Sequence, residues 1–337
     1  MIPLPFTSPL LNPYRNMRDR TLRGENLFIA EGDLVVERLL DSPFPVESVM
    51  VVDRAVQRVR TMLEKKVPQN VPIYLVKFTE VESLVGFPFH QGILALGNRS
   101  TPWSLQDFLS PKDFYSPLEV ISHPEVKTSP EIYPPHNLSI PHNLIPPPDI
   151  LTPSVLPAPQ ETIPNSDLSG DLKNKEDLRS KEEPKISRKC IIVLPDITKP
   201  DNLGNVFRCG AALGADGILL GSQACDPLSR RAMRVSMGGV MQLPWIKSQD
   251  LIKDLHFLKS SYGYQIYATV VSENAIPLPE ICWGPKIILC FGNEYDGLKP
   301  ELLAECDFHI TIPMSREVDS LNLGVSAGIF LYSALRT

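Results

Sequence analysis

The C-terminal stretch 286–337 places two polar loops directly after two apolar segments, and it limits the possible fold more than any other part of the chain. The segments Ile287–Phe291 and Phe308–Ile312 each predict a short buried strand. Loops 292–297 and 315–322 follow these strands, and an apolar final helix follows the second loop. Ligands of open α/β sheets bind at the carboxyl ends of strands. The stretch therefore predicts a ligand site at one edge of a sheet.

Short apolar segments alternate with helical segments through most of the remaining chain. In residues 1–100, strands are predicted at Val49–Val52, Ile73–Val76 and Ile93–Leu96, with helices at Asp33–Leu40 and Val56–Lys65. From Lys189, strands are predicted at Cys190–Leu194, Gly217–Leu220 and Gln265–Val271, with helices within 196–214, near 228–237 and at 250–262. This alternation predicts the α/β class, with a mostly parallel sheet from Lys189 onward.

Residues 101–188 have a different composition, with 16 of the 34 prolines and 13 acidic against 8 basic side chains. They contain too little apolar periodicity to bury a core, so we predict a disordered or extended linker between domains 1–100 and 189–337. His136 and His142 have no acidic or cysteine partner at ligand spacing, so no metal site is predicted there. A docking site for a protein partner is the alternative interpretation of this linker.

The overall composition indicates a soluble, cytoplasmic protein. No apolar run is long enough to cross a bilayer, and the N-terminus has no recognisable targeting signal. The six cysteines form no C-x-x-C pair, which favours reduced thiols over a metal or disulfide framework. The net charge of −6 is concentrated in the proline-rich segment, so it does not exclude an RNA partner for the rest of the chain.

Three motifs lie in the loops that follow predicted strands: Asn202-x-Gly204-x-x-x-Arg208, Gly292-Asn293-Glu294-x-x-Gly297-Leu298 and Ser320-Leu321-Asn322. They offer one arginine, one glutamate and several amides. No histidine lies near Ser320 at a strand end, which argues against hydrolase chemistry. Taken alone, Asn202 would be interpreted as a helix cap and Arg208 as an exposed helical residue.

Together, in this order and at these spacings, the motifs resemble the signatures of the SpoU (TrmH-like) RNA 2′-O-ribose methyltransferases of the SPOUT superfamily. The resemblance covers Lys189–Thr337, although Leu323–Ser326 departs from the family pattern after Asn322. Segments Phe28–Gly32 and His90–Ile93 also resemble the family's optional N-terminal RNA-binding domain. The resemblance implies a trefoil-knotted α/β domain that binds S-adenosylmethionine and assembles as a homodimer.

The resemblance also implies roles for individual residues. Four would bind S-adenosylmethionine: Gly292, Ile312, Met314 and Leu321. Five would form the catalytic site: Asn202, Arg208, Glu294, Ser320 and Asn322. Arg208 matches the family's catalytic arginine, but a guanidinium is always protonated and is a poor base. We therefore expect it to hold an RNA phosphate and stabilise the developing alkoxide, with Asn202 and Glu294 orienting it or the ribose.

Two groups of arginines are candidates for RNA contacts, with a solvated surface as the equally good alternative for each. The first group is Arg15, Arg18, Arg20 and Arg23, and the second is Arg230 and Arg234 on one helical face. The N-terminal domain favours a large structured RNA, so ribosomal RNA is preferred over transfer RNA. The alternatives are a transfer-RNA 2′-O-methyltransferase and a non-catalytic RNA-binding member of the same fold, against which the intact motifs argue.

Overall fold

The computed structural model of this chain describes residues 1–15, 19–87, 89–100, 102–109, 188–315 and 320–336. The chain divides into two compact units, Met1–Lys112 with Ile186–Thr337, and Asp113–Lys185. The second unit lies outside the described residues, as do Arg18, His136, His142 and most of the predicted linker. The domain boundaries proposed from the sequence therefore stay a prediction.

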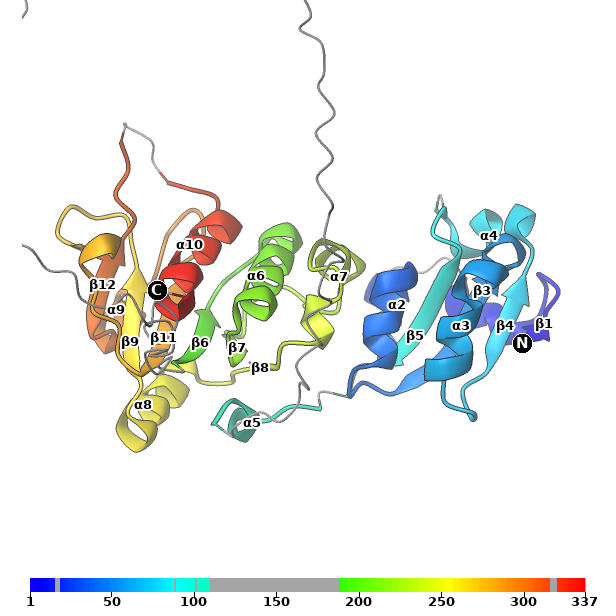
Figure 1. The fold of residues 1–337 in the computed structure, drawn as a ribbon, viewed down its shortest axis with the longest axis horizontal. Coiled ribbons are helices and arrows are strands. Elements are labelled where there is room, and N and C mark those ends of the chain that lie inside the picture. Colours follow the sequence, from blue (N-terminus) through cyan, green and yellow to red (C-terminus); the bar gives the residue numbers. More distant parts are fainter. Residues whose placement is uncertain (16–18, 88, 101, 110–187, 316–319, 337) are drawn as a thin grey trace, which may run out of the picture. The chain divides into compact units, whose positions relative to one another are not determined.

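A mixed sheet forms the N-terminal part of the first unit (Figure 1). In the described part of the chain its five strands have the order β1-β4-β3-β5-β2, with bounds Ile2–Pro3, Ile73–Val76, Val46–Val52, Ile93–Asn98 and Leu27–Glu31. Strands β1, β4 and β3 run parallel, whereas β5 runs antiparallel to β3 and β2. All of Val49–Val52 is buried, as expected for a central strand covered on both faces.

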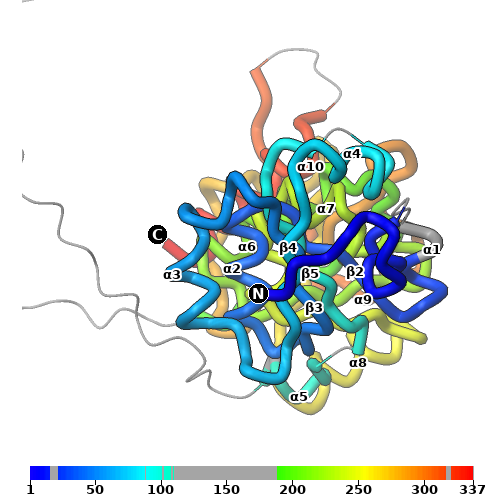
Figure 2. The backbone as a smooth tube through the Cα atoms, turned by 90° about the vertical axis from the view of Figure 1, so that its right-hand side faces the viewer, coloured from blue at the N-terminus to red at the C-terminus, as the bar shows by residue number. Residues whose placement is uncertain are grey.

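The helices of this part are α1 (Asp19–Gly24), α2 (Asp33–Leu40), α3 (Val56–Lys66) and α4 (Phe78–Val85). Figure 2 shows α3 to one side of the strands and α1 to the other. Helix α2 buries Val35, Val36 and Leu39, which recur at the spacing of one helical face. A short helix, α5 (Leu105–Leu109), follows the sheet, and the Trp103 ring before it meets the Trp245 ring edge to face at 6.0 Å.

A parallel sheet forms the C-terminal part of the same unit. In the described residues its seven strands have the order β10-β12-β9-β11-β6-β7-β8. Their bounds are Ile276–Pro277, Phe308–Thr311, Gln265–Thr269, Lys286–Phe291, Lys189–Leu194, Gly217–Leu220 and Trp245–Lys247. Central strand β11 pairs with β6 through Ile288 and Ile191, and with β9 through Leu289 and Tyr267. Strands β6, β7 and β8 lie on one side of β11, and β9, β12 and β10 lie on the other. The strand order therefore reverses at the centre of the sheet.

Helices α6 (Pro200–Leu213), α7 (Arg230–Val235), α8 (Leu251–Tyr262), α9 (Pro300–Glu305) and α10 (Leu323–Arg336) connect or follow these strands. Helix α6 begins with a proline, which has no amide hydrogen to leave unpaired in the first turn. It ends before Gly214, whose φ of +90° suits the left-handed position after a helix. Helices α6 and α10 lie side by side, green and red in Figure 1.

The structure confirms the α/β class and the parallel sheet after Lys189. Strands β4 and β7 and helix α2 have the predicted bounds, and the other predicted elements differ only at their ends. Strands β1, β2, β8 and β10 and helices α1, α4, α5 and α9 were not predicted. Strand β8 has only three residues, too few to show an alternating pattern. Among the described residues, no helix combines the length and the apolar character that a membrane crossing requires.

Candidate functional site

A cavity of about 680 Å³ lies where strands β9, β11 and β12 end and helix α6 begins. This volume is in the range of small-molecule sites in proteins. All four residues expected to hold a cofactor line it: Gly292, Ile312, Met314 and Leu321. Four of the five expected catalytic residues also line it: Asn202, Glu294, Ser320 and Asn322. The fold thus brings all three sequence motifs to one cavity.

Hydrogen bonds connect one residue from each motif inside this cavity. The Asn202 side-chain amide donates to Glu294 Oε1, and Asn322 Nδ2 donates to Asn202 Oδ1 at 3.0 Å. Asn322 Oδ1 in turn accepts the backbone N–H of Gly324 at 2.9 Å, at the start of α10. Asn202 is only 6% exposed, so its donor and its acceptor are satisfied by protein rather than solvent. This chain of bonds fixes the three loops to each other.

Glu294 keeps one acceptor available inside the cavity. Its Oε1 accepts from Asn202, while Oε2 is buried without a hydrogen-bond partner among the described residues. A buried carboxylate oxygen without a partner is costly, which is why such atoms are rare and often belong to functional sites. Glu294 Oε2 is therefore suited to accept a hydrogen bond from a bound molecule.

Gly292 allows the second motif to fold back tightly after β11. A Cβ atom at this position would lie 2.3 Å from the Gly297 carbonyl carbon and 2.6 Å from the Leu298 nitrogen. Asn293 and Gly297 exchange two backbone hydrogen bonds of 3.0 Å, and Asn293 Nδ2 donates to the Asp196 carbonyl at 2.9 Å. The loop is thus fixed to the strand end of β6, and only glycine fits at its first position.

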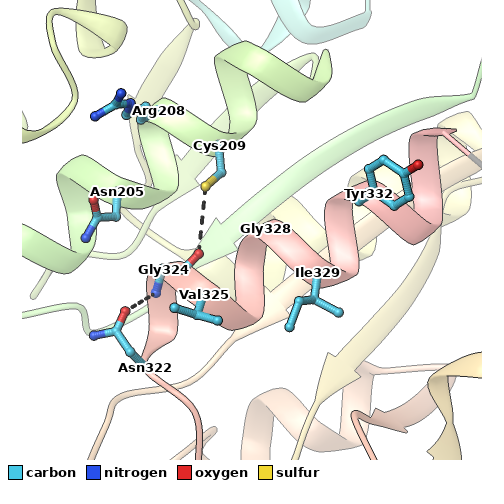
Figure 3. A pocket seen from close by; sticks show the side chains of 9 residues that line it. All are labelled: Asn205, Arg208, Cys209, Asn322, Gly324, Val325, Gly328, Ile329 and Tyr332. Carbon is cyan, nitrogen blue, oxygen red and sulfur yellow. Dashed lines mark hydrogen bonds between the residues drawn. The ribbon is translucent and has the colours of Figure 1, made fainter. Parts of the chain in front are cut away.

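Arg208 lies on the neighbouring side of the site. It lines a second cavity of about 570 Å³ between α6 and α10, together with Asn205, Cys209 and Asn322 (Figure 3). Its side chain is exposed, whereas the Cys209 thiol contacts the Gly324 carbonyl at 3.7 Å. Because Asn322 lines both cavities, Arg208 stands next to the hydrogen-bonded motif residues.

Ion pairs neutralise two carboxylates near the cavity, those of Asp196 and Asp201. Lys299 Nζ lies 2.8 Å from Asp196 Oδ2, and the hydrogen bond to Asp196 raises the pKa of the lysine. Arg231 Nε donates to Asp201 Oδ1 at 2.9 Å, and this hydrogen bond lowers the pKa of the Asp201 carboxyl. The Arg231–Asp201 pair is exposed, and in the other pair an exposed lysine meets a half-buried Asp196, so both pairs contribute mainly to the local charge balance.

The structure places the candidate RNA-binding arginines in different environments. Arg15 stacks over the Phe6 ring, and Arg23 lies 3.8 Å from Asp226. Arg18 and the Arg20 side chain lie outside the described residues. Arg230 does not extend into solvent as the helical pattern suggested, because it pairs with Glu31 at 2.8 Å and stacks on Phe87. Arg234 is exposed at the end of α7.

Sequence reasoning missed several residues that line the larger cavity, among them Lys199, Thr269, Val271 and Tyr295. Thr269 ends β9 and Val271 lies two residues after it, in a segment that carries no motif. Lys199 and Tyr295 lie inside or beside the first two motifs, at positions that the motif spacing leaves open. The sequence signal for Lys199 was its position directly before a helix start, and the signal for Tyr295 was an aromatic side chain in a polar loop.

The family resemblance is confirmed by comparison with known proteins. Residues 189–332 match the model of the SpoU rRNA Methylase family. An uncharacterised tRNA/rRNA methyltransferase of Mycobacterium bovis is 37% identical over 150 residues, which are 44% of this chain and 52% of that protein. A 23S rRNA (guanosine-2′-O-)-methyltransferase of Acinetobacter baylyi is 30% identical, over 43% of this chain and 59% of that protein. The chain thus spans little more than half the length of these curated relatives.

Solved structures share the fold over nearly the whole chain. An AdoMet-bound rRNA methyltransferase from Sinorhizobium meliloti superimposes with a TM-score of 0.65 at 19% identity, over 99% of this chain and 97% of that one. The SpoU methyltransferase AviRb from Streptomyces viridochromogenes, in complex with AdoMet, gives a TM-score of 0.62 at 15% identity, over 97% and 96% of the two chains. At these identities the similarity is one of fold.

Proposed function

We propose that the chain, whose residues 189–332 match the SpoU rRNA Methylase family model, transfers a methyl group from S-adenosylmethionine to a ribose 2′-hydroxyl of RNA. One observation carries this proposal: the three motifs, far apart in the sequence, meet in one cavity through the bonds of Asn202 to Glu294 and Asn322. A cavity assembled from backbone turns and side-chain amides, without a nucleophile–base pair among its described lining residues, suits a donor that carries its own activation.

The larger cavity fits S-adenosylmethionine in size and in the character of its lining. Its volume of about 680 Å³ accommodates a ligand of this size. Ile312, Met314 and Leu321 offer apolar surface for the adenine, and the tight turn at Gly292 leaves backbone groups accessible. Glu294 Oε2 offers a buried acceptor without a partner in the described chain. We propose that these residues hold the cofactor, which when bound supplies an electrophilic methyl group.

The residues of the chain would position the ribose and manage its proton. We propose that Asn202 and Asn322 hold the third loop closed over the site, so that the 2′-hydroxyl is aligned with the methyl donor. Arg208, which stands beside Asn322, would bind a flanking RNA phosphate and stabilise negative charge on the hydroxyl oxygen as its proton leaves. Ser320 at the cavity rim would hold the same loop.

We also propose that the RNA is ribosomal rather than transfer RNA. A relative named for 23S ribosomal RNA supports this choice, as does a sheet-forming N-terminal part of about a hundred residues that could bind a large RNA. Arg15, Arg18, Arg20, Arg23 and Arg234 are the proposed phosphate contacts, with Arg230 contributing only if its pair with Glu31 opens.

Three further properties belong to this proposal. We propose a trefoil knot in the C-terminal sheet domain and a homodimer formed through α10. Val325, Ile329 and Tyr332 project from one face of that helix and are 52%, 37% and 57% exposed (Figure 3). A second copy would cover this apolar face beside Arg208. We propose that the reaction takes place in the cytoplasm. We also propose that residues 101–188 are a linker that can bind a protein partner.

Transfer of labelled methyl groups tests the proposal. Purified chain is incubated with labelled S-adenosylmethionine and either ribosomal or transfer RNA lacking modifications. We expect label in ribosomal RNA, and loss of at least about a hundredfold in rate for Arg208→Ala, the size typical when a transition-state charge contact is removed. Label in transfer RNA alone would show that the substrate is transfer RNA instead of ribosomal RNA. Cofactor binding without label in either RNA would indicate a different RNA substrate, whereas absence of cofactor binding would favour a non-catalytic RNA-binding protein.

A further inference from the structure

Tyr295 is the most exposed large apolar side chain in the described chain, at 78%, and it stands on the rim of the larger cavity. An aromatic ring held in water beside a ligand cavity gains nothing for folding, since it leaves its apolar surface unburied. The residue lies between Glu294, whose carboxylate points into the site, and Asp296. Its position therefore points to contact with a bound molecule.

The loop that carries Tyr295 is held in one conformation. The Tyr295 N–H donates to Asn293 Oδ1 at 2.9 Å, and Asn293 Nδ2 donates to the Asp196 carbonyl at 2.9 Å. Asn293 and Gly297 close the loop with two backbone hydrogen bonds, and Leu298 is buried behind it. Binding on this ring would therefore lose little conformational freedom, as a preorganised surface should.

Lys199 places a positive charge against the same ring. Its ammonium lies 4.8 Å from the centre of the Tyr295 ring, in cation–π geometry. Lys199 is exposed and directly precedes α6, so it stands at the end of the helix that attracts anions. The nearby Asp201 carboxylate is already neutralised by Arg231. With the ammonium on one face of the ring, the other face of Tyr295 is available to a flat partner.

We propose that Tyr295 and Lys199 form a nucleotide-binding platform, on which an RNA base stacks against the tyrosine ring while its phosphate pairs with the lysine. Stacking on an aromatic ring and a contact to phosphate are the two interactions with which proteins hold unpaired nucleotides. The inference rests on the proposed function, because it names the part of the RNA substrate that the methyl-transfer site holds. It adds two residues that the three motifs do not include.

Binding of short RNA tests the platform without requiring methyl transfer. The affinity of the full-length chain is measured for fluorescein-labelled octauridylate and for an abasic octamer with the same ribose-phosphate backbone. Wild-type protein is expected to prefer octauridylate by roughly 5- to 100-fold, the range for one stacked base. Tyr295→Ala should abolish this preference, Tyr295→Phe should keep it, and Phe257→Ala, which removes a 43% exposed ring on α8, should not change it.

Salt dependence separates the lysine from the tyrosine. Lys199→Gln should lower the slope of log affinity against log salt concentration by about 0.7, the value for one phosphate contact to a single strand, while Lys199→Arg retains the slope. Tyr295→Ala should leave the slope unchanged. Binding of S-adenosylmethionine, followed by calorimetry, should be the same in all of these variants.

Three results would overturn the inference. Equal wild-type affinity for octauridylate and the abasic octamer would show that no base stacks on the protein. A preference that survives Tyr295→Ala would assign it to other residues, and weaker S-adenosylmethionine binding with unchanged RNA binding would make the pair part of the cofactor site. If wild-type protein methylates no RNA, the proposed function fails, but the two octamers still decide whether the platform exists.

Discussion

Asn202 is the residue through which the three loops depend on each other. Its amide nitrogen donates to Glu294 and its oxygen accepts from Asn322, so one buried side chain satisfies one partner from each of the other motifs. A single-residue interpretation as a helix cap does not describe it, since Lys199 rather than Asn202 occupies the position before α6. Polar groups arranged in this way specify one loop conformation because each is costly without its partner.

Replacing Asn202 should therefore affect both stability and activity. Asn202→Ala leaves the Glu294 and Asn322 groups without partners, and we expect the free energy of unfolding to fall by about 1–3 kcal/mol. Methyl transfer should fall by at least tenfold. Denaturant unfolding and steady-state rates measure the two effects. Asn274→Ala, an exposed asparagine in the loop before β10, serves as the control and should change neither.

Asn202→Asp gives a pH-dependent version of the same defect. A second carboxylate beside Glu294 repels it when both are ionised, so one of the two takes up a proton more readily in the folded state. Such a group stabilises the folded chain at low pH, and that contribution is lost as pH rises. The deficit in unfolding free energy relative to wild type should hence be larger at pH 8 than at pH 5. A deficit in unfolding free energy that does not depend on pH would show that the side chain at position 202 does not lie next to Glu294.

Gly292 gives the third prediction at this scale. A methyl group there would overlap the backbone of Gly297 and Leu298, so Gly292→Ala must displace the loop. We expect a loss of stability of about 1–3 kcal/mol, as for other overpacked sites, and weaker cofactor binding. Calorimetry with S-adenosylmethionine measures the second effect. Gly24→Ala, where an added Cβ meets nothing within 4 Å, is the matched control and should bind normally.

At the scale of elements, α6 and α10 pack closely because α10 presents glycines to α6: Gly324 faces Asn205 and Gly328 faces Cys209. A Cβ on Gly324 would lie 2.6 Å from the Cβ of Asn205, so the two helices approach at a distance that only glycine permits there. This close approach puts Asn322, at the start of α10, within reach of Asn202 on α6. The adjoining face of α10 carries Ile329 and its exposed apolar neighbours, which line the second cavity beside α6 and remain uncovered in a single chain.

The proposed homodimer makes a prediction for that exposed face. Ile329→Asp places a charge in the interface without disturbing the buried side of α10, so we expect the sedimentation coefficient to change from that of a dimer to that of a monomer. Phe257→Asp, at an exposed position on α8, should leave the assembly unchanged. Wild-type protein that sediments as a monomer at all concentrations would contradict the dimer.

At the scale of the whole molecule, residues 1–112 and 186–337 form one compact unit although more than seventy residues separate them in the sequence. Replacing 113–185 by a flexible glycine-serine segment of about twenty residues spans some 25 Å by chain statistics. We expect the unfolding equilibrium constant of the remaining unit to change by no more than about twofold, as for other tolerated changes of loop length. The rate of methyl transfer should also change by no more than about twofold. A large loss of stability or of rate would assign residues 113–185 a part in the fold or the site.

How much the sequence could predict depended on whether a feature is local. The apolar run of β11 and the glycines around Glu294 define a strand and its loop without distant partners, so both were predicted with nearly the right bounds. The environment of Arg230 was not predictable, because its partner Glu31 lies 199 positions away. The same holds for Arg208, which lines the second cavity through the packing of α6 on α10. The role of Tyr295 depended on exposure, which no periodicity reveals for a loop.

The location of the transferred methyl group tests the central claim most directly. Ribosomal RNA methylated by the full-length chain with labelled S-adenosylmethionine is hydrolysed in alkali, which cleaves only next to a free 2′-hydroxyl. The account predicts that the label is recovered in dinucleotides that resist alkali, and that enzymatic digestion then yields a single 2′-O-methylated nucleoside. Label recovered in mononucleotides would place the methyl group on a base and contradict ribose methylation at the site formed by Asn202, Glu294 and Asn322.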